Sequence, residues 1–131
     1  MPFLSSGKEE KLSKKEIRIT CIGSDFVDID DLIPLQGDLK ELSEANYQKY
    51  KNSILKHGFS EPVSVWYNEL GEINYILNGT QKVKTCRRMR AEGFVVPLVP
   101  INLVECKDEN EAYEKILAFA SQYGEISDKY F

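Results

Sequence analysis

The residues best placed to do chemistry lie where an apolar, strand-like pattern ending at Leu77 runs through a short turn into a strongly basic helical pattern. A strand that enters a helix through a glycine turn leaves the first N–H groups of the helix without partners. The helix dipole adds partial positive charge at the same point, so such a turn suits a phosphate or another anion. The candidate phosphate- or nucleotide-binding residues are Asn78, Gly79, Thr80, Gln81 and Lys82.

The helical pattern after this turn carries five cations and no acidic residue before Glu92, although the formal net charge of the chain is -4. The cations are Lys82, Lys84, Arg87, Arg88 and Arg90. Helical spacing spreads them around the axis, and positions 84, 87 and 88 share one face. Lys84, Arg87 and Arg88 are therefore the candidates for a DNA-binding patch. Two plainer interpretations remain open, because Asn-Gly is a common turn and a basic helix face is often only solvated.

The 131 residues are enough for one domain with a single core, and 42% apolar with 29% charged residues is ordinary for a globular protein. We expect a flexible, charged lead over residues 1–15 and one domain over 16–131. No apolar run has the length of a membrane span, and the N-terminus lacks a signal pattern. We therefore expect a cytoplasmic protein with no membrane partner.

The three cysteines are odd in number and widely spaced, and no C-x-x-C pair occurs among Cys21, Cys86 and Cys106. This pattern predicts reduced thiols and no metal site. Cys86 lies in the basic segment, where neighbouring cations would lower a thiol pKa, but its position favours a small core residue. His57 is the only histidine, and its place before Gly58 suits contact with the last carbonyls of a helix more than catalysis.

Helix signals are clear in three places. Ser43 is a candidate N-cap for a helix that ends at Gly58, with Leu42 and Tyr47 as a hydrophobic staple. A second helix is expected over about 80–91, closed by Gly93, and a third begins at a capping box formed by residues 108 and 111.

Strand signals are shorter. Residues 16–22 alternate like a strand, residues 26–29 form a second extended piece, and residues 32–38 are expected to be irregular. Residues 62–67 and 72–77 predict a hairpin, and residues 95–104 predict a strand that starts late or lies at an edge because of its two prolines. The fold class expected is α+β.

Several segments, in this order, resemble a ParB/sulfiredoxin-like domain, also called a ParB-like nuclease domain. They are Leu39–Ser43, Lys56–Trp66, Leu77–Lys82, Val96–Pro100, Glu111-Ala112 and Ser121–Gly124. The nearer match is the ParB-like module of phage and mobile elements, which is fused ahead of DNA-modification methyltransferases. The resemblance runs from about Phe26 to Ile126 and implies a mixed sheet with about three helices.

In this superfamily the turn at the helix start holds a nucleotide phosphate, so the resemblance implies ATP or CTP with Mg at positions 78–82. Three departures bear on activity. Lys82 stands where arginine is usual and lacks its planar fork. Asn78 replaces a frequent aspartate. Thr80 stands where sulfiredoxins carry their reactive cysteine, which argues against sulfinic-acid repair.

Three functions follow as hypotheses. The first is a phosphate- or nucleotide-binding module of phage or mobile-element origin that acts in DNA transactions, with DNA or a DNA-modifying protein as its partner. The second is an NTPase or nuclease that uses the phosphate loop, with Asp38, Glu41 and Glu61 as candidate carboxylates.

The third hypothesis is a structural interaction module whose phosphate site is degenerate. Such a module could assemble as a homo-oligomer. Its partner surface would be aromatic. The residues for that surface are Tyr47, Tyr50, Trp66, Tyr67 and Tyr75.

Overall fold

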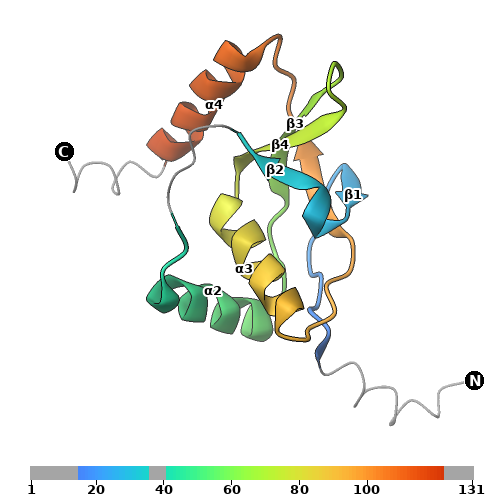
Figure 1. Ribbon diagram of the computed structural model, residues 1–131, viewed down its shortest axis with the longest axis vertical. Coiled ribbons are helices and arrows are strands. Elements are labelled where there is room, and N and C mark those ends of the chain that lie inside the picture. Colours follow the sequence, from blue (N-terminus) through green and yellow to red (C-terminus); the bar gives the residue numbers. More distant parts are fainter. Residues whose placement is uncertain (1–14, 36–40, 123–131) are drawn as a thin grey trace, which may run out of the picture.

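The computed structural model describes residues 15–35 and 41–122 (Figure 1). Expectations for the flexible lead, for Asp38 and for the end of the Ser121–Gly124 motif fall on residues outside these ranges. The strands are β1 (Asp25–Val27), β2 (Leu32–Pro34), β3 (Val63–Asn68), β4 (Ile73–Asn78) and β5 (Val99–Leu103). The helices are α2 (Glu44–His57), α3 (Thr80–Ala91) and α4 (Glu109–Gln122), with a 3₁₀ turn at Ile29–Asp31.

The five strands form one mixed sheet in the order β1-β5-β3-β4-β2. β3 pairs with β4 as an antiparallel hairpin and with β5 in parallel, while β2 runs parallel to β4 and β1 antiparallel to β5. With three α-helices in the described part of the chain, this confirms the expected α+β class, mixed sheet and helix number.

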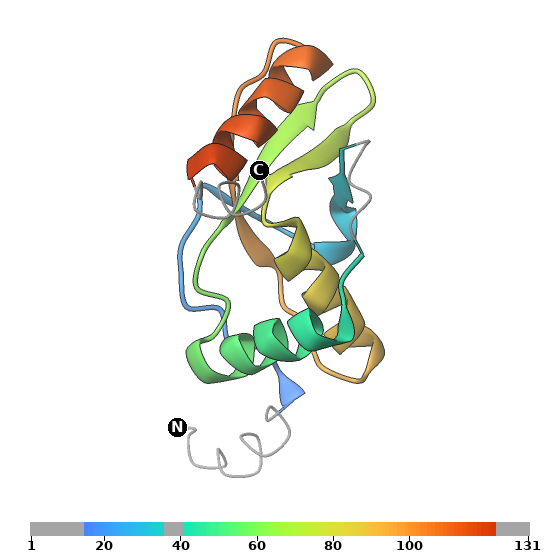
Figure 2. The same cartoon turned by 90° about the vertical axis from the view of Figure 1, so that its left-hand side faces the viewer.

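Helices cover both faces of this sheet (Figure 2). Side chains that alternate along a strand point to opposite faces. Val65 and Ile76 belong to the larger core, which includes α2 and α3 residues, whereas Trp66 and Leu77 belong to a smaller core with α4. The chain therefore leaves β4 with both faces packed and enters α3 directly.

The predicted helix boundaries are confirmed, and so are their caps. Ser43 Oγ accepts from the Asn46 amide at 3.1 Å, and Asp108 Oδ1 accepts from the Glu111 amide at 2.9 Å. Gly58 and Gly93 have φ angles of 83° and 106°, which favour glycine after a helix end.

Two strand predictions were wrong. Residues 16–22 do not form a strand of the sheet. They make isolated bridges from Glu16 to Val95 and from Ile19 to Phe59. Because Val95 and Phe59 belong to separate segments, they cannot supply a continuous ladder. Residues 32–34 are not irregular but form β2. Pro34 is tolerated because β2 is an edge strand, where a missing N–H breaks no second ladder. β5 starts late as expected, but it lies inside the sheet and not at its edge.

Candidate functional site

The turn between β4 and α3 has the backbone form that the glycine predicts. Gly79 has φ 107° and ψ 15°, and the first helical bond runs from the Val83 amide to the Gly79 carbonyl at 3.0 Å. No side chain caps the helix, and its first turn contains no acidic residue. Among the described residues, none accepts a hydrogen bond from the amides of Thr80, Gln81 or Lys82. Three N–H groups and an uncompensated helix dipole therefore face one point.

The Lys82 side chain turns back along the chain toward the segment that leads into β3. Its Nζ donates to the Glu61 carbonyl at 2.9 Å, lies 3.9 Å from the Glu61 carboxylate and sits 4.9 Å from the centre of the Phe59 ring. The side chain is only 19% exposed, and burial lowers its pKa, with Glu61 acting in the opposite direction. Lys82 is thus a half-buried cation at the edge of the turn and not a solvent-facing one.

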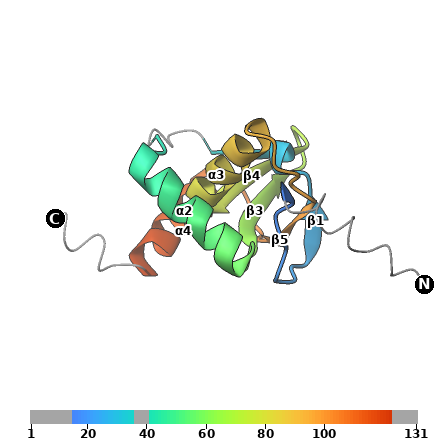
Figure 3. The same ribbon diagram turned by 90° about the horizontal axis from the view of Figure 1, so that it is seen from below.

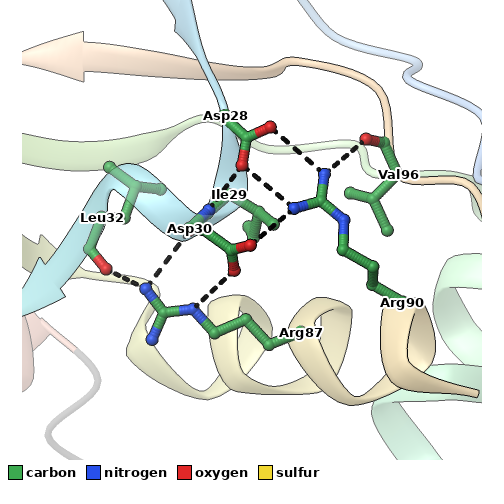
Figure 4. A network of polar contacts seen from close by, with 7 residues as sticks. All are labelled: Asp28, Ile29, Asp30, Leu32, Arg87, Arg90 and Val96. Atoms are coloured by element: carbon green, nitrogen blue, oxygen red, sulfur yellow. Dashed lines mark hydrogen bonds and ion pairs between the residues drawn. The ribbon is translucent and has the colours of Figure 1, made fainter.

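The arginines of α3 are held by neighbouring parts of the fold, and two of them bind the 3₁₀ turn (Figure 4). Arg90 contacts Asp28 at 3.0 Å and Asp30 at 2.8 Å, and it also donates to the Val96 carbonyl at 3.0 Å. The hydrogen bond from Arg90 holds the pKa of Asp28 below its ordinary value. The planar guanidinium of Arg90, whose N–H donors have fixed directions, suits this arrangement of two carboxylates and a carbonyl.

Arg87 completes the same cluster from one turn earlier. Its Nη2 donates to the carbonyls of Leu32 and, at 3.3 Å, Ile29, and its Nε lies 3.6 Å from Asp30. Arg87 therefore satisfies backbone oxygens at the entry to β2.

Arg88 points to a different partner, the start of α2. It binds Glu44 at 2.9 Å and Glu92 at 3.3 Å, and its guanidinium lies 3.8 Å from the centre of the Tyr47 ring. The Tyr47 hydroxyl donates to Glu92 at 2.5 Å, and Lys51 lies 3.2 Å from the same carboxylate. Burial, followed by this hydrogen bond, raises the pKa of Tyr47 to about 12.

The three candidates for DNA contact are consequently not gathered into one open patch. Arg87 faces the 3₁₀ turn and Arg88 faces α2, while Lys84 between them is half-buried. The residues missed by the sequence reasoning are the acidic partners of the two arginines, Asp30 for Arg87 and Glu44 for Arg88. No local pattern links either of them to α3.

The carboxylates considered for catalysis have different surroundings where the structure describes them. Glu61 lies beside Lys82, Glu41 is exposed ahead of α2, and Asp38 falls outside the described residues. Among the described residues, no group of three or more histidine, cysteine, aspartate or glutamate side chains could hold a metal ion.

Cys86 is a core residue, since it is fully buried and burial raises its pKa to about 12. His57 is exposed, and the last carbonyls of α2 are bound by other donors. Arg18 donates to the Lys56 carbonyl at 2.8 Å and Thr20 to the His57 carbonyl at 3.0 Å. The alternating pattern over residues 16–22 was the sequence signal for these two contacts, because it places the polar side chains of Arg18 and Thr20 opposite the apolar ones.

The proposed aromatic surface is only partly exposed. Tyr47 is buried, and Trp66 stacks on Tyr75 with ring centres 5.6 Å apart inside the α4 core. Tyr50 and Tyr67 are 38% and 42% exposed.

Comparisons with protein families, curated proteins and solved structures gave no match to this chain. None of the helices in the described ranges combines the length and the apolar composition of a membrane span.

Proposed function

We propose that this chain is a ParB/sulfiredoxin-like module that binds a phosphate group at the start of α3 and acts in DNA transactions. The observation that carries the proposal is the trio of amides at Thr80, Gln81 and Lys82, which have no acceptor among the described residues. They follow Gly79, whose backbone lies in the left-handed region, in the turn where the resemblance to this superfamily implies a bound phosphate.

The charge distribution of the helix starts supports the same point. The 3₁₀ turn, α2 and α4 each begin with a side-chain cap and with at least one acidic residue in the first turn. These groups satisfy amides and offset the dipole. α3 has neither, and its first turn carries Lys82 instead. An anion from outside the chain would supply what the other three starts have built in.

Lys82 and Glu61 fit this role as a displaceable pair. The Glu61 side chain is 72% exposed, and its carboxylate is 3.9 Å from the Lys82 ammonium, which is a loose contact. A phosphate with two negative charges competes favourably for that cation. The Glu61 carboxylate then turns to solvent, while the Glu61 carbonyl keeps its hydrogen bond from the Lys82 ammonium.

Such a phosphate belongs either to a nucleotide, ATP or CTP with Mg as the resemblance implies, or to a nucleic acid backbone. In the first case the module senses a nucleotide during a DNA transaction. In the second it contacts DNA or works beside a DNA-modifying protein.

A thermal-melting series tests the proposal. The full chain is melted with phosphate, sulfate, ATP, CTP or GTP, each with and without magnesium, and at least one of them is expected to raise Tm. The same series is then run on Gly79→Ala and on Gly93→Ala. Both glycines have φ near 106° and lie at opposite ends of α3, so each alanine costs about 1–2 kcal/mol of backbone strain.

Only Gly79→Ala should abolish the ligand shift, because only this substitution re-aims the three amides. The steric cost of the new Cβ is small, since it would meet the Val63 side chain at 3.5 Å. No shift with any anion, or an equal loss of the shift in Gly93→Ala, contradicts the proposal.

The internal ion pairs of the arginines favour a second candidate, an interaction module whose basic helix is structural. In this case no anion changes Tm. Light scattering of the full chain then shows an oligomer, and substitution of Tyr50 or Tyr67 to serine weakens it.

A further inference from the structure

Two cations that are open to solvent lie on α2. Lys49 and Lys56 are exposed and seven residues apart, which places them on one face of the helix. Each follows a buried residue, Tyr47 or Ile54, by two positions, so it lies about 200° around the axis from the core. Figure 3 shows α2 as an outer element of the molecule.

This face of α2 is free of negative charge. Its other members are Ala45, Asn52 and Ser53, and the only acidic residue of the helix, Glu44, is bound to Arg88 and Gln48. Among the described residues no carboxylate forms an ion pair with Lys49 or Lys56. The chain carries four more negative than positive charges, so a surface of this kind is unusual within it.

A third exposed cation lies at the C-terminal end of the helix. Arg18 is exposed, and its guanidinium is fixed by its bond to the Lys56 carbonyl. Because Arg18 and Thr20 occupy the last carbonyls of α2, the negative end of the helix dipole is covered. The chain after His57 leads to Phe59, whose ring centre lies 4.9 Å from the Lys82 ammonium.

We infer that Arg18, Lys49 and Lys56 form a surface that binds the phosphodiester backbone of double-stranded DNA. The inference rests on the proposed function and moves its DNA contact from α3, whose arginines are paired internally, to α2. Lys49 and Lys56 are about 10 Å apart along the helix, close to the axial rise of three nucleotides on one strand. Backbone contacts of this kind give affinity without sequence preference.

Fluorescence anisotropy with a labelled duplex of about two helical turns measures the binding of the full chain at low and at physiological salt. Lys49→Glu is compared with Lys107→Glu, an exposed lysine ahead of α4 that gives the same change in net charge. Lys49→Glu should weaken binding roughly tenfold at low salt, and Lys107→Glu less than about twofold. In Lys49→Ala/Lys56→Ala, the slope of log affinity against log salt should fall by about two.

Three results would overturn the inference: no binding by the unchanged protein, equal weakening by Lys107→Glu, or binding to vesicles of anionic phospholipid in place of the duplex. Melting the Lys49→Glu protein with phosphate keeps the two proposals apart. If phosphate still raises Tm but the α2 substitutions do not weaken DNA binding, only the α2 surface is rejected. If phosphate does not raise the Tm of the unchanged protein, the site at α3 is rejected.

Discussion

The two ends of α3 carry the same sign of side-chain charge in opposite surroundings. At the first turn, one half-buried lysine stands beside three amides that have no acceptor among the described residues. Over the last two turns, three arginines meet four carboxylates and three backbone carbonyls, contributed by the 3₁₀ turn, α2 and the chain after α3. The acidic partners are Asp28, Asp30, Glu44 and Glu92.

The contrast teaches that the number of basic residues on a helix does not identify a binding surface. An arginine whose donors already meet carboxylates and carbonyls has few left for a phosphate, and releasing it would expose its partners unpaired. The C-terminal half of α3 is therefore expected to matter for stability, and its first turn for ligand binding. Substitutions at the two ends should separate these properties.

Replacing Arg90 is expected to have the largest effect on stability. Arg90→Ala leaves Asp28 and Asp30 without their main partner and removes the bond to the Val96 carbonyl. With the side chain about one-third exposed, the free energy of unfolding should fall by about 2 kcal/mol. Urea denaturation measures this, and Arg90→Lys should recover only part of the loss. A phosphate shift that disappears in the folded variant would contradict the separation of the two ends.

Tyr47→Phe tests the second cluster at the same end. The variant keeps the buried ring and removes the hydroxyl that donates to Glu92, so unfolding should become easier by about 1 kcal/mol. The pKa of Tyr47, about 12, lies above its ordinary value of 10.0. The native contribution is therefore complete below pH 10 and is lost as the pH rises toward 12. Urea midpoints across this range should fall more steeply for the unchanged protein than for Tyr47→Phe.

Lys82→Met sharpens the comparison from the first turn. The methionine retains an apolar stem beside Phe59, and the fold no longer buries a charge whose pKa is lowered by burial. The unfolding free energy should change by less than about 1 kcal/mol, whereas phosphate affinity should fall several-fold. Isothermal titration with phosphate checks the second point. Unchanged affinity would show that the amides act without the lysine.

The elements that the sequence predicted well are those specified by neighbours along the chain. Ser43, Asp108, Gly58 and Gly93 set helix ends through contacts a few residues away, so their positions could be inferred from spacing. β2 could not be inferred, because its three residues become a strand only by pairing with β4, some forty residues later.

The same limit applies to the site. The backbone form of Gly79 is local, and it was expected from the residue type. The partners of Arg90 are not local, since Asp28 lies 62 residues earlier and meets it only after the sheet has assembled. A helical wheel shows which side chains share a face, but it does not show which part of the fold that face meets.

Low pH provides the smallest test, and it addresses the Arg90 end of α3. The hydrogen bond from Arg90 lowers the pKa of Asp28 below 3.8, so the unfolded chain binds a proton more readily than the native one. The contribution of Asp28 is therefore complete above this value and is lost as the pH falls through its native pKa. Because the carboxylate is 42% exposed, we expect less than about 1 kcal/mol. Asp28→Asn should be less stable than the unchanged protein near neutral pH, and urea midpoints should converge toward low pH. A difference that persists or widens in acid would mean that Asp28 acts through packing, and the Arg90 cluster would then be steric and not electrostatic.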